Sequence, residues 1–154
     1  MRLTFHADYS LRVLLYLASH PDRLVSTVEI SQAYNISRNH LVRVVNNLGK
    51  KGFIEVHPGR SGGIKLGRQP EEIILGEVIR ATEPDFYLVE CFDKRTNSCP
   101  ITPACGLKSI LKEAVDSFLQ TLNRYTLRDI SQNHSELALL LALPKRKQRI
   151  KTKA

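Results

Sequence analysis

The sequence lacks any long hydrophobic run, and this absence excludes several classes of protein. No segment of the 154 residues approaches the roughly 18 consecutive apolar residues that a membrane-spanning helix needs. The first residues, 1–6, have neither the apolar core nor the small-residue cleavage site of a signal peptide. We therefore expect a cytoplasmic protein that does not bind a membrane.

Cysteine is scarce, with three residues in the whole chain. Cytoplasmic thiols stay reduced, so we expect free thiols rather than disulfides. With 42% hydrophobic and 25% charged residues and no low-complexity body, the composition is that of a globular protein. The length fits one domain, or one domain with a dimerisation arm.

Positive charge is uneven along the chain. Residues 1–68 hold ten lysines and arginines against four acidic residues, whereas residues 69–144 hold seven against eleven. The tail, 145–154, carries six basic residues and no acid. A basic first half favours a module that binds a polyanion, while a basic tail by itself can serve only solubility or loose electrostatic contact.

The first half predicts three helices. Residues 4–19 place apolar side chains at helical spacing, which predicts a helix with one buried stripe. The stripe consists of Ala7, Leu11, Leu14, Leu15 and Ala18. Ser26 followed by Glu29 has the form of a capping box and begins a second helix. Asn35 suits a left-handed turn, and Ser37 caps a third helix over residues 38–50, which completes a helix-turn-helix.

A β-hairpin is predicted directly after the third helix. Residues 53–57 and 64–66 have strand character, and the segment 58–63, Pro-Gly-Arg-Ser-Gly-Gly, has turn chemistry. A hairpin in this position is a wing. The order of helix, helix-turn-helix and wing indicates a winged-helix module more specifically than any one of these elements alone.

The outer face of the third helix carries side chains that suit base edges. Arginine binds guanine in a bidentate manner and asparagine binds adenine, and the N-terminal residues of such a helix meet the bases. Hydroxyls at helix starts suit phosphates, and an arginine at the wing tip suits a minor groove. We expect contacts with double-stranded operator DNA from Ser26, Thr27, Ser37, Arg38, Asn39, His40, Arg43 and Arg60. The alternative is an ordinary solvated helix face.

All the cysteines lie within fifteen residues, at Cys91, Cys99 and Cys105. They lie in or beside the segment 84–104, a predicted loop that is unusually long for a compact domain. Thiolates suit zinc or an iron–sulfur cluster. Zinc sites usually show paired cysteines two to four residues apart, which this chain lacks, and wide spacing favours a bulky cluster. A four-iron cluster would lack one cysteine ligand here, so its fourth ligand would be a carboxylate, a histidine, a small molecule or a group from the second subunit. An open or weakly bound iron is where a diatomic gas would attack.

Other interpretations of the cysteines remain open. They are a structural zinc site and a redox-active thiol loop without a metal. An enzyme is a further class, but no Cys–His or Ser–His–Asp grouping stands out as catalytic machinery. We therefore expect a protein that is not an enzyme.

A long helix is predicted from Cys105 onward, with apolar residues at helical spacing up to Tyr125. Twenty helical residues reach about 30 Å, more than a small winged helix can cover. A second copy in a symmetric homodimer would cover the surplus apolar face, and packing within the chain's own core is the alternative. The predicted fold is mainly α: a winged helix-turn-helix with a small β-hairpin wing and a long dimerisation helix.

Six segments carry a family resemblance: 1–4, 8–9, 11–12, 36–41 (Ile-Ser-Arg-Asn-His-Leu), 59–67 (Gly-Arg-Ser-Gly-Gly-Ile-Lys-Leu-Gly) and 99–105 (Cys-Pro-Ile-Thr-Pro-Ala-Cys). Together they resemble the NsrR group of nitric-oxide-sensitive repressors, in the winged-helix family that includes the cluster regulator IscR. The resemblance covers residues 1–143. It implies a dimer in which the long helix crosses its symmetry mate.

The resemblance also implies a set of cluster ligands. Cys91, Cys99 and Cys105 would hold the cluster, and Asp8 of the other subunit would complete a 4Fe–4S form. IscR-like proteins use a histidine for a 2Fe–2S cluster where this chain has Lys108. A 4Fe–4S cluster is therefore favoured, with 2Fe–2S as the alternative. The gap from Cys91 to Cys99 is longer than is usual in the group.

These observations predict a DNA-binding transcriptional repressor that senses nitric oxide through an iron–sulfur cluster and releases its operator on nitrosylation. The alternative is an iron–sulfur or thiol-redox regulator that responds to cluster status or oxidants. The predicted organisation is a winged-helix DNA-binding domain (1–83), a cysteine cluster loop (84–104), dimerisation helices (105–143) and a basic tail (144–154).

Overall fold

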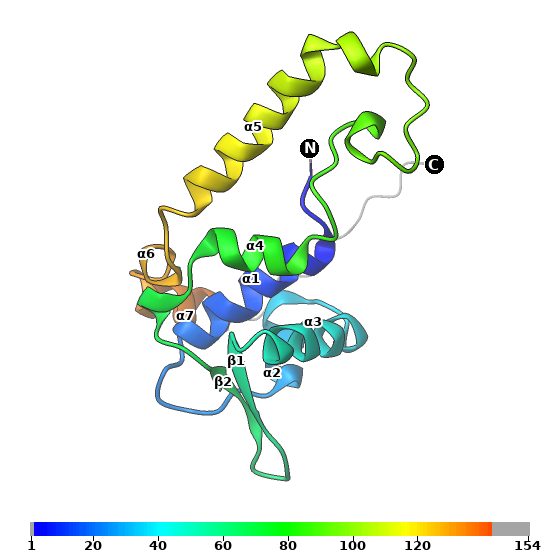
Figure 1. Ribbon diagram of the computed structural model, residues 1–154. Helices are drawn as coiled ribbons and strands as arrows, with labels where there is room; N and C mark the ends of the chain where they lie inside the picture. Colours follow the sequence, from blue (N-terminus) through cyan, green and yellow to red (C-terminus); the bar gives the residue numbers. More distant parts are fainter. Residues whose placement is uncertain (1, 143–154) are drawn as a thin grey trace, which may run out of the picture.

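A winged head and a projecting arm make up the part of the chain that the computed structural model describes, residues 2–142 (Figure 1). The helices are α1 (Phe5–Ala18), α2 (Thr27–Tyr34), α3 (Arg38–Lys50), α4 (Leu75–Thr82), α5 (Gly106–Leu122), α6 (Leu127–Ile130) and α7 (His134–Ala142). The strands are β1 (Ile54–His57) and β2 (Gly63–Leu66). Three short 3-10 turns complete the order: η1 (Pro70–Glu72), η2 (Glu90–Phe92) and η3 (Thr102–Ala104). The predicted mainly helical fold with a small hairpin is confirmed, and the basic tail lies outside the described residues.

Helix α1 runs through the middle of the head, where it contacts α3, α4, α6 and β2. The predicted single stripe is partly wrong, because three of its members are only half-buried: Leu11, Leu15 and Ala18. Four residues of the helix outside the stripe are buried: Ser10, Val13, Tyr16 and Leu17. A one-sided pattern describes a helix at the edge of a core, whereas α1 is covered from several sides.

The helix-turn-helix forms at the predicted positions. Ser26 caps α2 by accepting a hydrogen bond from the backbone N–H of Glu29 (3.1 Å), and Ser37 caps α3 in the same way from His40 (3.4 Å). Asn35 ends α2 with a φ of 54°, the left-handed conformation that asparagine tolerates. Helix α3 buries one face against the head through Leu41, Val44, Val45 and Leu48. Its other face remains exposed.

The wing is an antiparallel pair in which Ile54 lies opposite Leu66 and Val56 opposite Ile64. Its turn contains Gly59 with a φ of 105°, which only glycine adopts without strain. The base of the wing is also hydrogen-bonded to the segment before α2, because Val25 and Ile64 exchange two backbone bonds of 3.0 and 2.8 Å. The wing is therefore attached directly to the helix-turn-helix.

The arm consists of the loop after α4 and the helix α5 (Figure 1). The only buried residue of α5 is Val115, while Leu107 and Ile110 are 58% and 63% exposed. The chain then returns to the head, where Leu127 of α6 is fully buried and its N–H donates to the carbonyl of Ile73 (2.8 Å). Within residues 2–142, no helix combines the length and the apolar character needed to cross a membrane.

A polar network fixes the start of α2 against α1. The hydroxyl of Tyr16 donates to Glu29 (2.8 Å), and the guanidinium of Arg23 pairs with both carboxylate oxygens of Glu29. The carboxylate thus bonds to these two residues, although the sequence predicted that it would complete a capping box with Ser26. Burial, and then the bond to Glu29, raise the pKa of Tyr16 to about 12, while the hydrogen bond from Arg23 lowers the pKa of Glu29. The network spans the loop between the two helices.

Replacing Glu29 by Gln tests this network. The pKa of Glu29 is lower in the folded chain than in the unfolded one, so the charge stabilises the fold above the ordinary glutamate pKa of about 4.3. That stabilisation disappears as the pH falls through the folded-state pKa. Because the pair is partly exposed, we expect Glu29→Gln to cost at most about 1 kcal/mol near neutral pH and nothing at acidic pH.

Urea unfolding, followed by circular dichroism near neutral pH and in acid, measures this difference. Glu71→Gln is the matched control, since Glu71 pairs with Arg128 on the surface. A stability loss for Glu29→Gln that persists in acid would show that the charge is not its cause.

Candidate nucleic-acid interface and cysteine loop

The outer face of α3 holds four of the residues predicted to read DNA. They are all exposed: Arg38, Asn39, His40 and Arg43. The imidazole of His40 lies 6.1 Å, centroid to centroid, from the ring of Tyr9 on α1. Asn46 and Lys50 extend the same polar face further along the helix. This surface offers donors and acceptors with no role in the core.

The capping hydroxyls lie at the starts of α2 and α3. Ser26 and Ser37 are exposed, and Thr27 is half-buried as the first residue of α2. Each serine oxygen accepts a hydrogen bond from its own helix, which leaves its proton free to donate. A phosphate oxygen at either helix start could therefore accept that proton and the remaining free backbone N–H groups.

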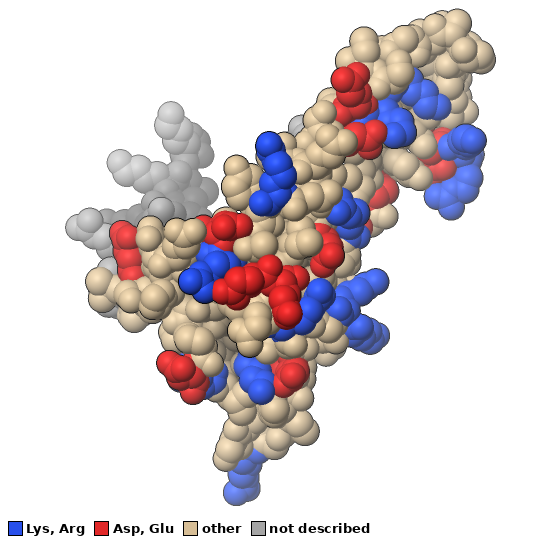
Figure 2. Space-filling model, turned by 60° about the vertical axis from the view of Figure 1, so that its left-hand side comes forward, with Lys and Arg blue, Asp and Glu red and all other residues tan. Residues whose placement is uncertain are grey.

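Arg60 lies in the turn of the wing and is exposed. Figure 2 shows positive charge at the very end of the wing and acidic side chains gathered higher up, across the middle of the same face. The structure therefore places positive charge where the wing projects furthest from the head.

The cysteine loop begins after α4 and ends at α5. Cys91 is buried within η2, whereas Cys99 and Cys105 are half-buried, and all of them are free thiols. Cys105 is the N-terminal capping residue of α5. The loop contains the short turns η2 and η3, so it is more ordered than the sequence predicted.

Two residues that sequence reasoning did not assign a role shape the loop around Cys99. The side-chain oxygen of Asn97 accepts the N–H of Cys99 (3.1 Å), and the hydroxyl of Thr102 donates to the carbonyl of Cys99 (2.8 Å). Asn97 also donates to Thr102 (3.1 Å). Asparagine is common in turns because its side chain bonds to nearby backbone groups, but the partners of Asn97 depend on the three-dimensional structure.

Asp8, the remaining candidate ligand, lies in the first turn of α1 and is half-buried. The guanidinium of Arg12 pairs with both of its oxygens, at 2.7 and 3.1 Å. Arg12 also lies 5.8 Å from the ring centres of Tyr9 and Tyr34, so this ion pair contacts the end of α2. The sequence did not predict this role for Arg12.

The start of α1 is also attached to the start of the cysteine loop. Glu83, which follows α4, accepts hydrogen bonds from the backbone N–H (2.7 Å) and the hydroxyl (3.1 Å) of Thr4. Thr4 in turn caps α1 by accepting the N–H of Ala7 (3.2 Å). A shift of the loop at Glu83 would therefore act directly on the helix that supports the helix-turn-helix.

No three His, Cys, Asp or Glu side chains among residues 2–142 lie close enough together to hold one metal ion. In a 4Fe–4S cluster each thiolate binds a different iron, so the ligands lie further apart than the ligands of a single metal ion. Three reduced thiols in one loop are the donor set that such a cluster uses, so these residues fit a cluster better than a single ion.

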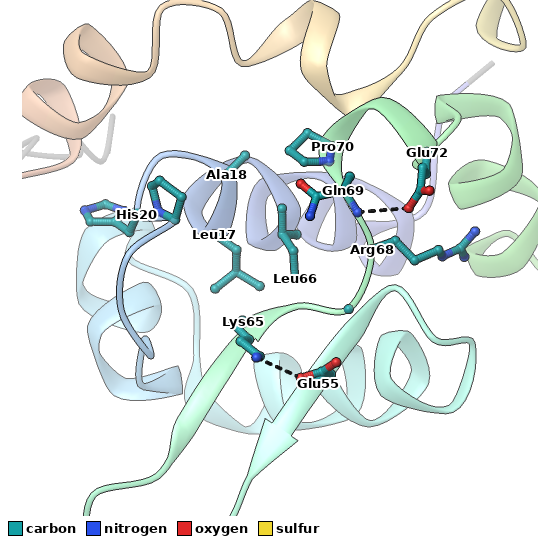
Figure 3. A pocket seen from close by; sticks show the side chains of 12 residues that line it. Leu17, Ala18, His20, Glu55, Lys65, Leu66, Arg68, Gln69, Pro70 and Glu72 are labelled. Atoms are coloured by element: carbon teal, nitrogen blue, oxygen red, sulfur yellow. Dashed lines mark hydrogen bonds and ion pairs between the residues drawn. The ribbon is translucent and has the colours of Figure 1, made fainter.

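A cavity of about 390 Å³ lies elsewhere, between the end of α1 and the base of the wing (Figure 3). Lys65 and Glu55, which lie opposite each other on β2 and β1, pair at 3.1 Å in its lining, and Glu72 accepts the backbone N–H of Gln69 (3.1 Å). No cysteine and no predicted DNA-binding residue lines it. The cavity is therefore separate from both candidate sites.

The family follows from comparison with known proteins. A family model described as "Rrf2: Iron-dependent Transcriptional regulator" matches residues 3–133. The chain belongs to the Rrf2 family. Among its Rrf2 relatives, the HTH-type transcriptional regulator NsrR of Bacillus subtilis is 49% identical over 144 residues, which is 93% of this chain and 99% of that protein. NsrR of Halalkalibacterium halodurans is 50% identical, with the same coverage. The resemblance to NsrR is thus confirmed.

Solved structures agree on the fold of this Rrf2 protein. IscR of T. potens superimposes with a TM-score of 0.70 at 23% identity, over 88% of this chain and 90% of that one. CymR of B. subtilis, described as the global cysteine regulator, superimposes with a TM-score of 0.63 at 23% identity, over 86% of this chain and 98% of that one. At these identities the likeness concerns the winged-helix fold alone.

Proposed function

We propose that this Rrf2 protein is a homodimeric DNA-binding repressor that senses nitric oxide through an iron–sulfur cluster. The observation that carries the proposal is the position of the free thiols: all of them lie in the one loop that joins the winged head to helix α5. The relatives are named as transcriptional regulators, which supports a regulatory role over an enzymatic one.

The DNA-binding residues of the proposal are those of the exposed winged surface. Arg38, Asn39, His40 and Arg43 would enter the major groove, since they are exposed at the start of α3. Ser26, Thr27 and Ser37 would bind phosphates through the helix starts, and Arg60 would reach the minor groove.

Cys91, Cys99 and Cys105 would hold the cluster, with Asp8 of the partner subunit as the fourth ligand. The 4Fe–4S form is favoured over 2Fe–2S because the chain has Lys108, not histidine, in the first turn of α5. When bound, such a cluster supplies iron atoms that can react with nitric oxide.

The chain's own contacts explain how a change at the loop could reach DNA. Asp8 is on α1, and its partner Arg12 lies beside Tyr34 at the end of α2. Glu83 ties the beginning of the loop to Thr4 at the beginning of α1. A movement of either contact would shift α1, which packs against α3. Operator binding would weaken once two heads lose the spacing of about 34 Å between successive major grooves.

The dimer of the proposal forms through α5. Leu107 and Ile110 are more than half exposed on a helix that buries only Val115 against its own head. Apolar side chains in such a row are covered in a stable protein, and a symmetric copy of the same helix provides a matching surface.

A regulator that responds to oxidants or to cluster supply is the second candidate. The half-buried state of Cys99 and Cys105 favours it, because thiols with partial solvent access can react with oxidants. The two candidates differ in whether nitric oxide or an oxidant releases the DNA.

The central experiment measures iron, acid-labile sulfide and operator binding on the same air-free preparation. We expect iron and sulfide together, and loss of the gel shift when nitric oxide is added, because the three thiolates hold the cluster. Cys99→Ser should lose the cluster and the response to nitric oxide.

Ser98→Ala is the matched control in the same loop, since Ser98 is beside Cys99 and should leave the cluster intact. Release by peroxide but not by nitric oxide would favour the second candidate. A preparation that responds to nitric oxide without iron or sulfide would contradict the proposed cluster in both its 4Fe–4S and its 2Fe–2S form.

Arg43→Ala tests the recognition surface. Loss of an arginine that binds a base or an adjacent phosphate should weaken specific binding by about 1–3 kcal/mol. Fluorescence anisotropy with operator DNA measures this loss, and Arg124→Ala, an exposed arginine after α5, should bind like the wild type. Equal affinities for Arg43→Ala and Arg124→Ala would remove Arg43 from the interface.

Ile110→Asp tests the dimer. A charge in the exposed apolar row of α5 should convert the dimer to a monomer and weaken operator binding, because burying an unpaired carboxylate is costly. Analytical ultracentrifugation measures the mass. Gln120→Asp places the same charge on the polar side of α5 and should remain dimeric. A dimeric Ile110→Asp protein would show that α5 is not the interface.

A further inference from the structure

One exposed residue of α3 is apolar. Val42 is 42% exposed, although its neighbours on the outer surface of the helix are polar or charged. It belongs neither to the core cluster of the described residues nor to the partly buried hydrophobics packed against that cluster. Packing within the head therefore gives no reason for an apolar side chain at this position.

Helical spacing places Val42 among the residues proposed to read DNA. Arg38 and Asn39 precede it by four and three residues, and Asn46 follows it by four. Residues at these separations are neighbours on a helix surface. Val42 therefore lies within the same exposed patch, in the first half of the helix, which enters the groove most deeply in helix-turn-helix proteins.

The polar neighbours of Val42 do not recognise one feature of the major groove, the methyl group of thymine. Arginine and asparagine recognise guanine and adenine through hydrogen bonds, whereas thymine is distinguished by its C5-methyl group. An apolar side chain is the complement of that methyl group. The stem of valine is short and branched, so its position is set by the backbone of α3 with little rotamer freedom.

We propose that Val42 is a specificity-determining residue that contacts a thymine methyl group in each half of the operator. This inference rests on the proposed function, since it requires α3 to lie in the major groove. The contact would bury one methyl group against the valine, and it would select thymine over cytosine at a position where no hydrogen bond from Arg38 or Asn39 does so.

The test begins with selection of double-stranded DNA from a random library by the full-length, air-free protein. Each thymine of the selected sequence is then replaced in turn by deoxyuridine, which keeps the base pair and removes only the methyl group. For the wild type we expect one thymine per half-site at which the change weakens binding about fourfold, the factor that corresponds to about 0.8 kcal/mol for one buried methyl-sized group.

Val42→Ser should bind more weakly than the wild type and should not distinguish thymine from deoxyuridine at that position. Val28→Ser is the matched control, because Val28 on α2 is 40% exposed and lies outside α3. It should retain the fourfold preference for thymine. Circular dichroism shows whether the variants are folded.

The outcomes separate this inference from the function on which it rests. Selection that enriches no sequence would contradict the proposed operator binding itself. Enrichment of a sequence in which no deoxyuridine substitution matters, or a Val42→Ser protein that retains the full thymine preference, would overturn the role of Val42 while leaving operator binding established.

Discussion

The burial of α1 from several sides is the constraint on which the rest of the structure depends. This helix contacts α3, α4, α6 and β2. Its buried residues leave little room for α1 to move alone, because cores are packed as densely as organic crystals. A displacement of its N-terminal end, at Thr4 or Asp8, would therefore act on the whole winged head.

Hydrogen bonds and an ion pair connect this packed helix to α2 and to the cysteine loop. Tyr16 and Glu29 attach its second half to α2, while Thr4 and Glu83 attach its beginning to the cysteine loop. Arg12 contributes a third connection, between Asp8 and Tyr34. In the proposed sensor, the same helix is thus in contact with the thiol-bearing loop at one end and with the helix-turn-helix along its length.

Local signals in the sequence predicted the elements of the head well. Ser26, Asn35 and Ser37 mark helix boundaries through short-range hydrogen bonds and backbone preferences, and the structure confirms these boundaries. The stripe on α1 was partly wrong because burial from several sides depends on distant elements. The partners of Glu29 and of Asn97 were not predicted for the same reason, since a side chain's choice among acceptors depends on the tertiary structure. The assignments of cluster ligands and DNA contacts stay predictions.

The two backbone hydrogen bonds between Val25 and Ile64 have a consequence for how a pair of heads could meet a double helix. They couple the base of the wing to the segment before α2, so a movement of the wing relative to the helix-turn-helix would have to break them. In the proposed dimer, adaptation to a longer or shorter gap between half-sites would then come from the junction between the head and the arm. In the proposed dimer, tolerance for the number of intervening base pairs would be a property of the chain around Glu83, where the head meets the cysteine loop, far from the residues proposed to face the bases.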